Sequence, residues 1–233
     1  ITGTDVGINQ EELLVMAKHS RFMVGLNADP TKFTALGLFS AIKVCLEKVF
    51  GNNQIQGHSF AIQGVGKIGE ALAELLYREG AHLFVADINK ERLRFIKKKY
   101  PRIKVTSPSE IYTQKVDCFC PCALSGALNR EIVPVLRCAI VIGGANNQLA
   151  DEATGHRLYG KNILYAPDYL VNAGGLISVV DEYEHKNSEE ERILRRIKVI
   201  SKNLQKILEL SNVQRRPPFQ IANEMAEKVF NGY

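Results

Sequence analysis

The sequence has no tryptophan and only three methionines, and none of its apolar runs approaches the roughly 18 residues that a membrane span needs. No signal peptide is recognisable at the amino terminus. Charged residues make up 24% of the chain and the net charge is only +5, which is ordinary for a globular protein. We therefore expect a cytoplasmic protein without a membrane partner.

Basic residues are not concentrated enough to indicate a nucleic-acid surface. They form two short runs, residues 97–99 and 192–198, on helical patterns without interleaved aromatic residues. A nucleic-acid patch is the alternative to a solvated helix face, but the absence of aromatic residues favours the helix face. We expect no nucleic-acid partner.

Five cysteines are present, an odd number, and three of them alternate in VDCFCPC. On a strand, Cys118, Cys120 and Cys122 would share one face, with Pro121 breaking the strand before the last. The spacing matches no standard zinc site. Reduced, packed thiols are therefore preferred over a metal site, and no metal ligand is assigned.

The most informative stretch is residues 60–87, FAIQGVGKIGEALAELLYREGAHLFVAD. It predicts a strand, a glycine turn, a helix and a second strand. Gly64, Gly66 and Gly69 form a complete G-x-G-x-x-G, and Asp87 follows roughly 20 residues later at the end of the second strand. That order of elements is typical of a dinucleotide-binding unit.

Each residue of the turn has a physical reason to be there. Gly64 permits the tight turn, Gly66 leaves no Cβ between the backbone and a pyrophosphate, and Gly69 allows helix and strand to pack closely. The N–H groups that open the helix would face the phosphates, so Lys67 and Ile68 join the candidate cofactor contacts.

Asp87 indicates which dinucleotide is bound. Its carboxylate can accept hydrogen bonds from a ribose diol and would repel a 2′-phosphate, so NAD is favoured over NADP. Lys90 and Arg92 follow closely and could contact a phosphate, which keeps NADP as the alternative.

The same alternation continues along the chain and predicts the fold class. We expect an α/β protein with a Rossmann-like doubly wound parallel sheet, flanking helices and a helical carboxyl-terminal tail. No strand is expected after Tyr165. Further strands are predicted at residues 103–105, 116–119, 139–142 and 163–165, and helices at 11–19, 90–100, 130–136, 193–208 and 221–230.

One helix precedes the glycine turn. We expect Thr34 to cap it and Gly51 to end it, with an apolar stripe between them that packs in the core.

Small and polar residues gather beyond the ends of four predicted strands, at residues 64–69, 121–126, 143–147 and 172–175. A single cluster of this kind is ordinarily a turn. Parallel sheets, however, bind ligands along the edge formed by the carboxyl ends of their strands. Four clusters along that edge therefore predict a ligand groove.

Together these clusters resemble a known family. TGTDVG, TALG, QGVGKIG, VADIN, PCALSG, GGANNQL and LYAPDYLVNAGGLISV look like the leucine, phenylalanine and valine dehydrogenase branch of the amino-acid dehydrogenases, most like the leucine enzymes. The resemblance covers Thr2 to about Glu182 and reaches glutamate dehydrogenase more distantly. It implies reversible oxidative deamination, in which an L-amino acid passes hydride to NAD and yields a 2-oxo acid and ammonia.

The resemblance also implies roles for individual residues. Asp5 matches the acid that relays protons to the reacting nitrogen, Gly3 a position beside the substrate side chain, and Asn172 the residue that hydrogen-bonds the substrate. The following Gly174 and Gly175 would allow close approach. Positions near the nicotinamide and its ribose are matched by Thr34, Ala123, Ala145, Asn146 and again Asn172.

The chain departs from the family pattern in one large respect. The family's amino-terminal domain carries two lysines, one of them in a GGxK segment, and no lysine of this chain follows a Gly-Gly pair. With no initiating methionine either, the chain looks like part of a longer protein that would bind NAD but turn over little alone. We expect residues 1–33 to be an inter-domain segment with substrate-site residues, 34–182 the NAD-binding domain and 183–233 helices packing on the sheet or on the missing domain. A homo-oligomer is implied, through that missing domain.

The substrate class is open at this point. A branched-chain amino acid is preferred, leucine first, with phenylalanine or another aromatic amino acid as the alternative. Ser125 replaces a family glycine and Val24 replaces the threonine of the leucine enzymes. A non-catalytic NAD-binding module is the alternative of a different class, although Asp5 and Asn172 favour an enzyme.

Overall fold

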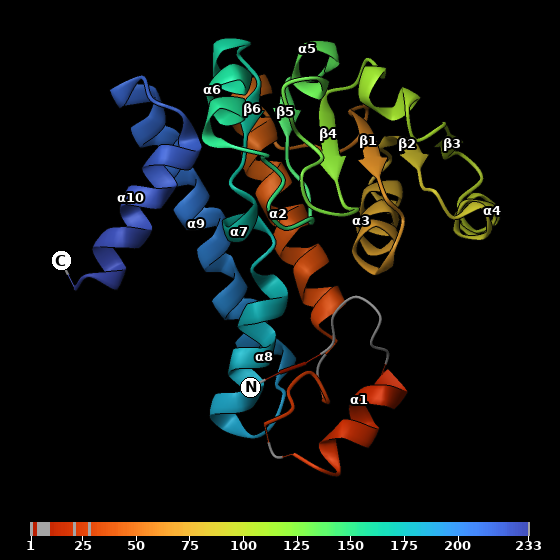
Figure 1. Ribbon diagram of the computed structural model, residues 1–233, viewed down its shortest axis with the longest axis vertical. Coiled ribbons are helices and arrows are strands. Elements are labelled where there is room, and N and C mark those ends of the chain that lie inside the picture. Colours follow the sequence, from red (N-terminus) through yellow and green to blue (C-terminus); the bar gives the residue numbers. More distant parts are fainter. Residues whose placement is uncertain (1, 4–9, 21, 28, 233) are drawn as a thin grey trace.

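The computed structural model describes residues 2–3, 10–20, 22–27 and 29–232 (Figure 1). It shows a six-stranded parallel sheet covered by helices, as the alternating sequence pattern predicts. Among the described residues, no helix combines the length and apolar character needed to cross a membrane.

The sheet has the strand order β3-β2-β1-β4-β5-β6, and every neighbouring pair is parallel. The chain therefore leaves β1 toward one side of the sheet and later returns to add β4 on the other. The carboxyl ends of β1 and β4 meet at this reversal, where doubly wound sheets bind dinucleotides. The strands are β1 (Ser59–Gln63), β2 (His82–Ala86), β3 (Lys104–Val105), β4 (Cys118–Pro121), β5 (Ile140–Val141) and β6 (Leu164–Tyr165).

Helices lie on both faces and extend beyond the carboxyl edge. Figure 1 shows α8, the amino-terminal end of α2 and α1 projecting below the ends of the strands. Within the described residues no strand follows Tyr165, as predicted. The helices are α1 (Gln10–Ala17), α2 (Pro30–Phe50), α3 (Lys67–Arg78), α4 (Lys90–Lys99), the 3-10 helix η1 (Glu110–Thr113), α5 (Ile132–Val135), α6 (Glu152–Gly160), α7 (Asp168–Val171), α8 (Gly174–His185), α9 (Glu190–Gln214) and α10 (Pro218–Phe230).

Alternate residues of the strands point into two separate cores. On one face, Phe60 and Ile62 of β1 pack with the apolar stripes of α2, α3 and α9. On the other face, Ala61 and Phe119 pack with η1, α5 and α6. Strands buried on both faces explain the short, continuous apolar runs of the sequence.

The start of α2 corrects one prediction. Thr34 does not cap the helix, because Asp29 is the N-cap and its carboxylate accepts a hydrogen bond from the Thr31 N–H at 2.9 Å. Pro30 takes the first helical position. The missing N–H of proline costs nothing there, because an N–H at that position has no partner within the helix. Thr34 is instead the fifth residue of the helix and donates its hydroxyl to the Pro30 carbonyl at 2.8 Å. Gly51 ends the helix with φ +75°, as predicted.

The cysteines are unpaired and packed, as predicted. Cys118 and Cys120 are fully buried on one face of β4, Pro121 ends the strand, and Cys122 packs against the same core. Burial raises the pKa of Cys122 to about 11, so its thiol is neutral at physiological pH. In the part of the chain that the structure describes, no group of three or more His, Cys, Asp or Glu residues could hold a metal ion.

Ionic contacts fix the far end of α8. Asp181 is fully buried and receives hydrogen bonds from two atoms of the Arg192 guanidinium and from Arg196. Its neighbour Glu182 is also buried and accepts the Gly25 N–H at 3.1 Å. The helix thus joins α9 on one side to the amino-terminal loop on the other.

Candidate functional site

The glycine turn lies between β1 and α3, where it was predicted. Gly64 has φ +90°, and a Cβ there would stand 2.9 Å from the Cα of Ala123, so this position needs glycine for both conformation and space. A Cβ on Gly69 would clash with the carbonyl oxygen of Gly64. Gly66 differs, because the nearest atom to its missing Cβ is the Arg92 guanidinium at 3.6 Å. Its outer face is therefore open to a ligand.

Asp87 is fixed beside this turn by the backbone. One carboxylate oxygen accepts the Val65 N–H at 2.8 Å and the other accepts the Asn89 N–H at 2.8 Å. A carboxylate has about four acceptor sites, so capacity for a ribose diol remains. The three glycines, the start of α3 and Asp87 thus form a cradle that fits an adenine dinucleotide.

The second and third clusters are joined to the first. Ala123 touches Gly64, and the Ala145 N–H donates to the Pro121 carbonyl at 3.0 Å. A Cβ on Gly144 would stand 2.5 Å from the Cγ2 atom of Ile68, so this glycine lets the turn after β5 lie against the start of α3. The turns along the carboxyl edge therefore adjoin one another, as a ligand groove at this edge requires.

The fourth cluster reaches the third through side chains. The Nδ2 atom of Asn172 donates to Oδ1 of Asn146 at 2.6 Å and lies 3.5 Å from the Gly144 carbonyl oxygen. These two asparagines were predicted near the nicotinamide from a family resemblance, and 26 residues separate them in the chain. The fold brings them into direct contact.

Gly174 and Gly175 do not serve the ligand approach that we expected of them. Both are buried where α8 crosses the start of α2. A Cβ on Gly174 would collide with the Phe33 carbonyl oxygen, and one on Gly175 would stand 2.5 Å from the Thr34 hydroxyl. Close helix packing therefore requires these glycines.

Two further predicted residues, Gly3 and Thr34, lie in described segments near α8. Thr34 is buried against Gly175, which follows Asn172 by three residues in the chain. Gly3 lies beside Val24, whose carbonyl oxygen would be 2.9 Å from a Cβ at Gly3. Asp5 lies outside the described residues. The ligand contacts assigned to these three residues stay predictions.

Two buried polar residues near the asparagines were not predicted. Gln148 is fully buried and Asp168 is 7% exposed, and both make hydrogen bonds within the turn after β5. Their signal in the sequence is weak, because polar residues beside a turn are ordinarily solvated. Only burial distinguishes them.

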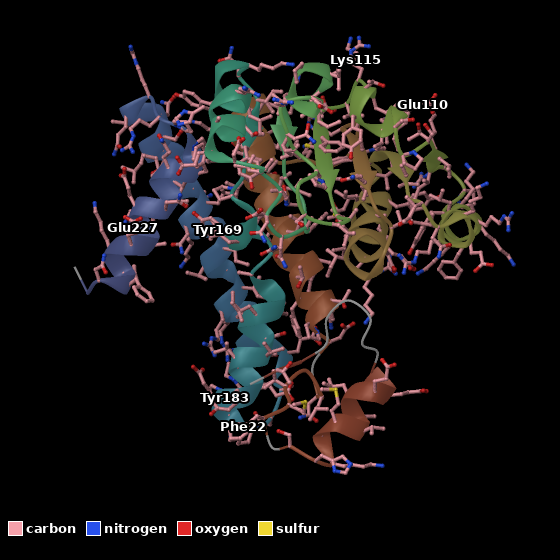
Figure 2. The ribbon with its side chains drawn as sticks, in the orientation of Figure 1. Phe22, Glu110, Lys115, Tyr169, Tyr183 and Glu227 are labelled. Atoms are coloured by element: carbon pink, nitrogen blue, oxygen red, sulfur yellow. The ribbon has the colours of Figure 1, made fainter. Side chains whose placement is uncertain are left out.

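A cavity of about 480 Å³ lies at the opposite edge of the sheet, where the strands begin. Figure 2 shows Lys115, one of its lining residues, at the upper edge of the molecule. Tyr183 of α8, which extends beyond the carboxyl edge of the sheet, lies at the opposite end. None of the predicted site residues lines this cavity. Ligands of doubly wound sheets bind at the carboxyl edge, so we do not assign the dinucleotide to it.

Comparisons with known proteins agree with this geometry. A family model described as Glutamate/Leucine/Phenylalanine/Valine dehydrogenase matches residues 84–229. Phenylalanine dehydrogenase from Thermoactinomyces intermedius is 40% identical over 85% of this chain and 56% of its own length. Leucine dehydrogenase from the same organism is 35% identical over 98% of this chain and 63% of its own length.

Among solved structures, L-tryptophan dehydrogenase from Nostoc punctiforme superposes with a TM-score of 0.87 and 34% identity. That match covers all of this chain and 67% of the other. The chain thus spans less than two thirds of the length of the curated relatives named above.

Proposed function

Because the chain belongs to the Glu/Leu/Phe/Val dehydrogenase family, we propose that it is the cofactor-binding portion of an NAD-dependent L-amino-acid dehydrogenase. The observation that carries the proposal is the convergence of four turns at one edge of the sheet, with the glycine cradle at one end and the Asn146–Asn172 contact at the other. A cofactor with a phosphate-bearing half and a polar reactive half needs both ends.

The family uses NAD(P), and NAD fits this site. Gly66 presents an open backbone where a pyrophosphate would lie, and Asp87 stands where the adenosine ribose would lie. When bound, NAD accepts the hydride that leaves the amino-acid carbon. A 2′-phosphate would face the carboxylate of Asp87 at close range, which disfavours NADP.

In this proposal the residues of the chain orient the substrate and move protons. Asn172 hydrogen-bonds the substrate, and Gly3 lies beside the substrate side chain. Asp5 transfers protons between the reacting nitrogen and water as the imino acid forms and is hydrolysed to the 2-oxo acid and ammonia. Contacts to the nicotinamide half come from Thr34, Ala123, Ala145 and Asn146.

Leucine is the first substrate candidate, because the motifs most resemble those of the leucine enzymes. An aromatic amino acid is the second candidate. It is supported by the 40% identity to a phenylalanine dehydrogenase and by the fit to a tryptophan dehydrogenase. Assays of leucine, valine, phenylalanine and tryptophan with the full-length protein distinguish the two by their kcat/KM values.

A binding experiment on this chain tests the cofactor proposal. We expect residues 1–233 to bind NADH and to deaminate leucine slowly or not at all. A normal rate of deamination by the isolated chain would contradict the assignment of catalytic lysines to another domain. NADH binding combined with an inactive full-length protein would favour the non-catalytic module instead.

Asp5 is tested in the full-length protein by Asp5→Asn. An amide of the same shape cannot relay a proton, so we expect kcat to fall by about 100-fold while NADH affinity stays within twofold. Unchanged kcat would remove Asp5 from the reaction.

A further inference from the structure

The turn that carries Asn146 has no regular secondary structure. Gly143 and Gly144 precede the asparagine and Asn147 follows it with φ +49°, a left-handed conformation that is uncommon outside glycine. An exposed side chain on such a turn would lose conformational entropy on binding a ligand. Precise placement of Asn146 therefore depends on side-chain hydrogen bonds that hold this turn in one conformation.

Gln148 supplies the first restraint. Its Nε2 atom donates to the carbonyl oxygens of Gly143 at 2.8 Å and of Ala145 at 2.9 Å. The side chain thus ties together the start and the middle of the turn from its buried side. Its Oε1 atom is buried without a hydrogen-bond partner among the described residues, which is costly and offsets part of the gain. An apolar side chain of equal volume would avoid that cost but would leave the carbonyl oxygens of Gly143 and Ala145 without this donor.

Asp168 supplies the second restraint. One carboxylate oxygen accepts the Gln148 N–H at 2.7 Å, and the other accepts the Tyr169 N–H at 2.6 Å. Its own carbonyl oxygen accepts the Asn172 N–H at 2.9 Å. The short helix α7 therefore holds the turn at two points, through Asp168 at its first residue and through Asn172 directly after its last.

The contact between the two asparagines is thereby fixed from both sides. It uses a donor of Asn172 and an acceptor of Asn146. An amide side chain carries two donors and two acceptor lone pairs, so a donor on Asn146 and an acceptor on Asn172 remain for a ligand. Their relative position depends on the turn geometry that Gln148 and Asp168 impose.

We propose that Gln148 and Asp168 are positioning residues that hold Asn146 and Asn172 in place for the nicotinamide half of the cofactor. The inference rests on the proposed function, because it assumes a nicotinamide dinucleotide at this edge. Neither residue contacts the cofactor in this arrangement. Both act through the turn after β5.

The decisive variant is Gln148→Met, which keeps the length of the side chain and removes both donated bonds. We compare the Kd of NADH with that of ADP-ribose, which has the same adenosine and pyrophosphate but no nicotinamide. Since each lost bond is worth about 0.5–1.5 kcal/mol, the expected result is an NADH affinity about tenfold weaker with ADP-ribose affinity within twofold. Asp168→Asn should weaken NADH binding about threefold with the same selectivity, and it carries the test if Gln148→Met does not fold.

Thr154→Val is the matched control. Thr154 is also fully buried and donates its hydroxyl to Asp151, but it lies in α6, outside the turn that carries Asn146. The variant should lose stability without changing the ratio of the two dissociation constants. A second test places Gln148→Met in an Asn146→Ala background, where it should weaken NADH binding clearly less than in the unmodified chain, because part of its effect acts through Asn146.

Parallel weakening of NADH and ADP-ribose, or an unchanged NADH affinity, would overturn the positioning role. Full additivity of the double variant would overturn it as well. Failure of the proposed function is a separate result, visible in the unmodified chain as binding of neither NADH nor ADP-ribose, and it would overturn both.

Discussion

Two groups of glycines lie at the same edge of the sheet, those of the glycine turn and those at the start of α8. The space left by their missing side chains is used differently. In the first group, Gly66 faces open space and leaves its backbone accessible. In the second, the Phe33 carbonyl and the Thr34 hydroxyl of α2 occupy the space where Gly174 and Gly175 would otherwise carry side chains. Gly66 leaves room for a ligand, whereas Gly174 and Gly175 leave room for a helix.

The difference shows how the site is supported. Close packing of α8 on α2 places the chain just before α8, which includes Asn172, at the ends of the strands. A larger residue at Gly174 would push the two helices apart and move the asparagine with them. The second glycine group thus serves the site indirectly, through helix packing.

The largest expected effect comes from Gly174→Ala. The new methyl group would collide with the Phe33 carbonyl, so we expect a loss of about 3 kcal/mol of stability and a fall in Tm of roughly 10 °C. Thermal and urea unfolding measure it. Gly160→Ala is the control, because no atom lies within 4 Å of its added Cβ. Equal stability of the two variants would contradict the packing role.

Asp181→Asn tests the other end of α8. The Arg192 guanidinium holds the pKa of Asp181 below its usual value. Because the folded pKa is depressed, the ionised carboxylate stabilises the protein above its unfolded pKa of about 3.9, and this contribution is lost as pH falls through the folded pKa. We expect a Tm about 5 °C lower for the variant at pH 7 and a smaller difference near pH 3. A pH-independent difference would exclude the ion pair as its cause.

Asp87→Ser tests the adenosine end of the first group. Loss of the carboxylate should weaken NAD binding about tenfold and reduce the discrimination against NADP, since Arg92 lies close to Gly66. Isothermal titration with both dinucleotides measures this. Asp117→Ser is the matched control. Asp117 also accepts a backbone N–H, from Ser59 at 2.7 Å, but it lies at the opposite edge of the sheet. NAD affinity that is unchanged in Asp87→Ser would contradict the ribose assignment.

Gly66→Ala gives the smallest effect and the sharpest contrast with Gly174→Ala. The added methyl group has space in the folded chain, so Tm should change by less than about 2 °C. It would stand between the backbone and the pyrophosphate, so NADH affinity should fall about fivefold. A variant that lost stability but kept NADH affinity would reverse the roles of the two glycine groups.

Much of the fold follows from local sequence alone. The second strand of the glycine unit was predicted just before Asp87 and spans His82–Ala86, because an apolar run between Gly80 and Asp87 leaves few alternatives. The glycine turn was equally clear, since φ +90° at Gly64 is a conformation for which glycine is strongly favoured. The start of α2 was missed because Asp29 and Thr34 are both good N-caps, and Pro30 decides between them.

The candidate site depended on both levels. Local spacing determined the cradle of Gly64, Gly66, Gly69 and Asp87, because its parts are neighbours in the chain and their geometry follows from backbone conformation. Tertiary structure decided what Gly174, Gly175, Gln148 and Asp168 do. Their environment is made by segments distant in the sequence, and neither an excluded Cβ nor a buried hydrogen bond leaves a periodic pattern along the chain.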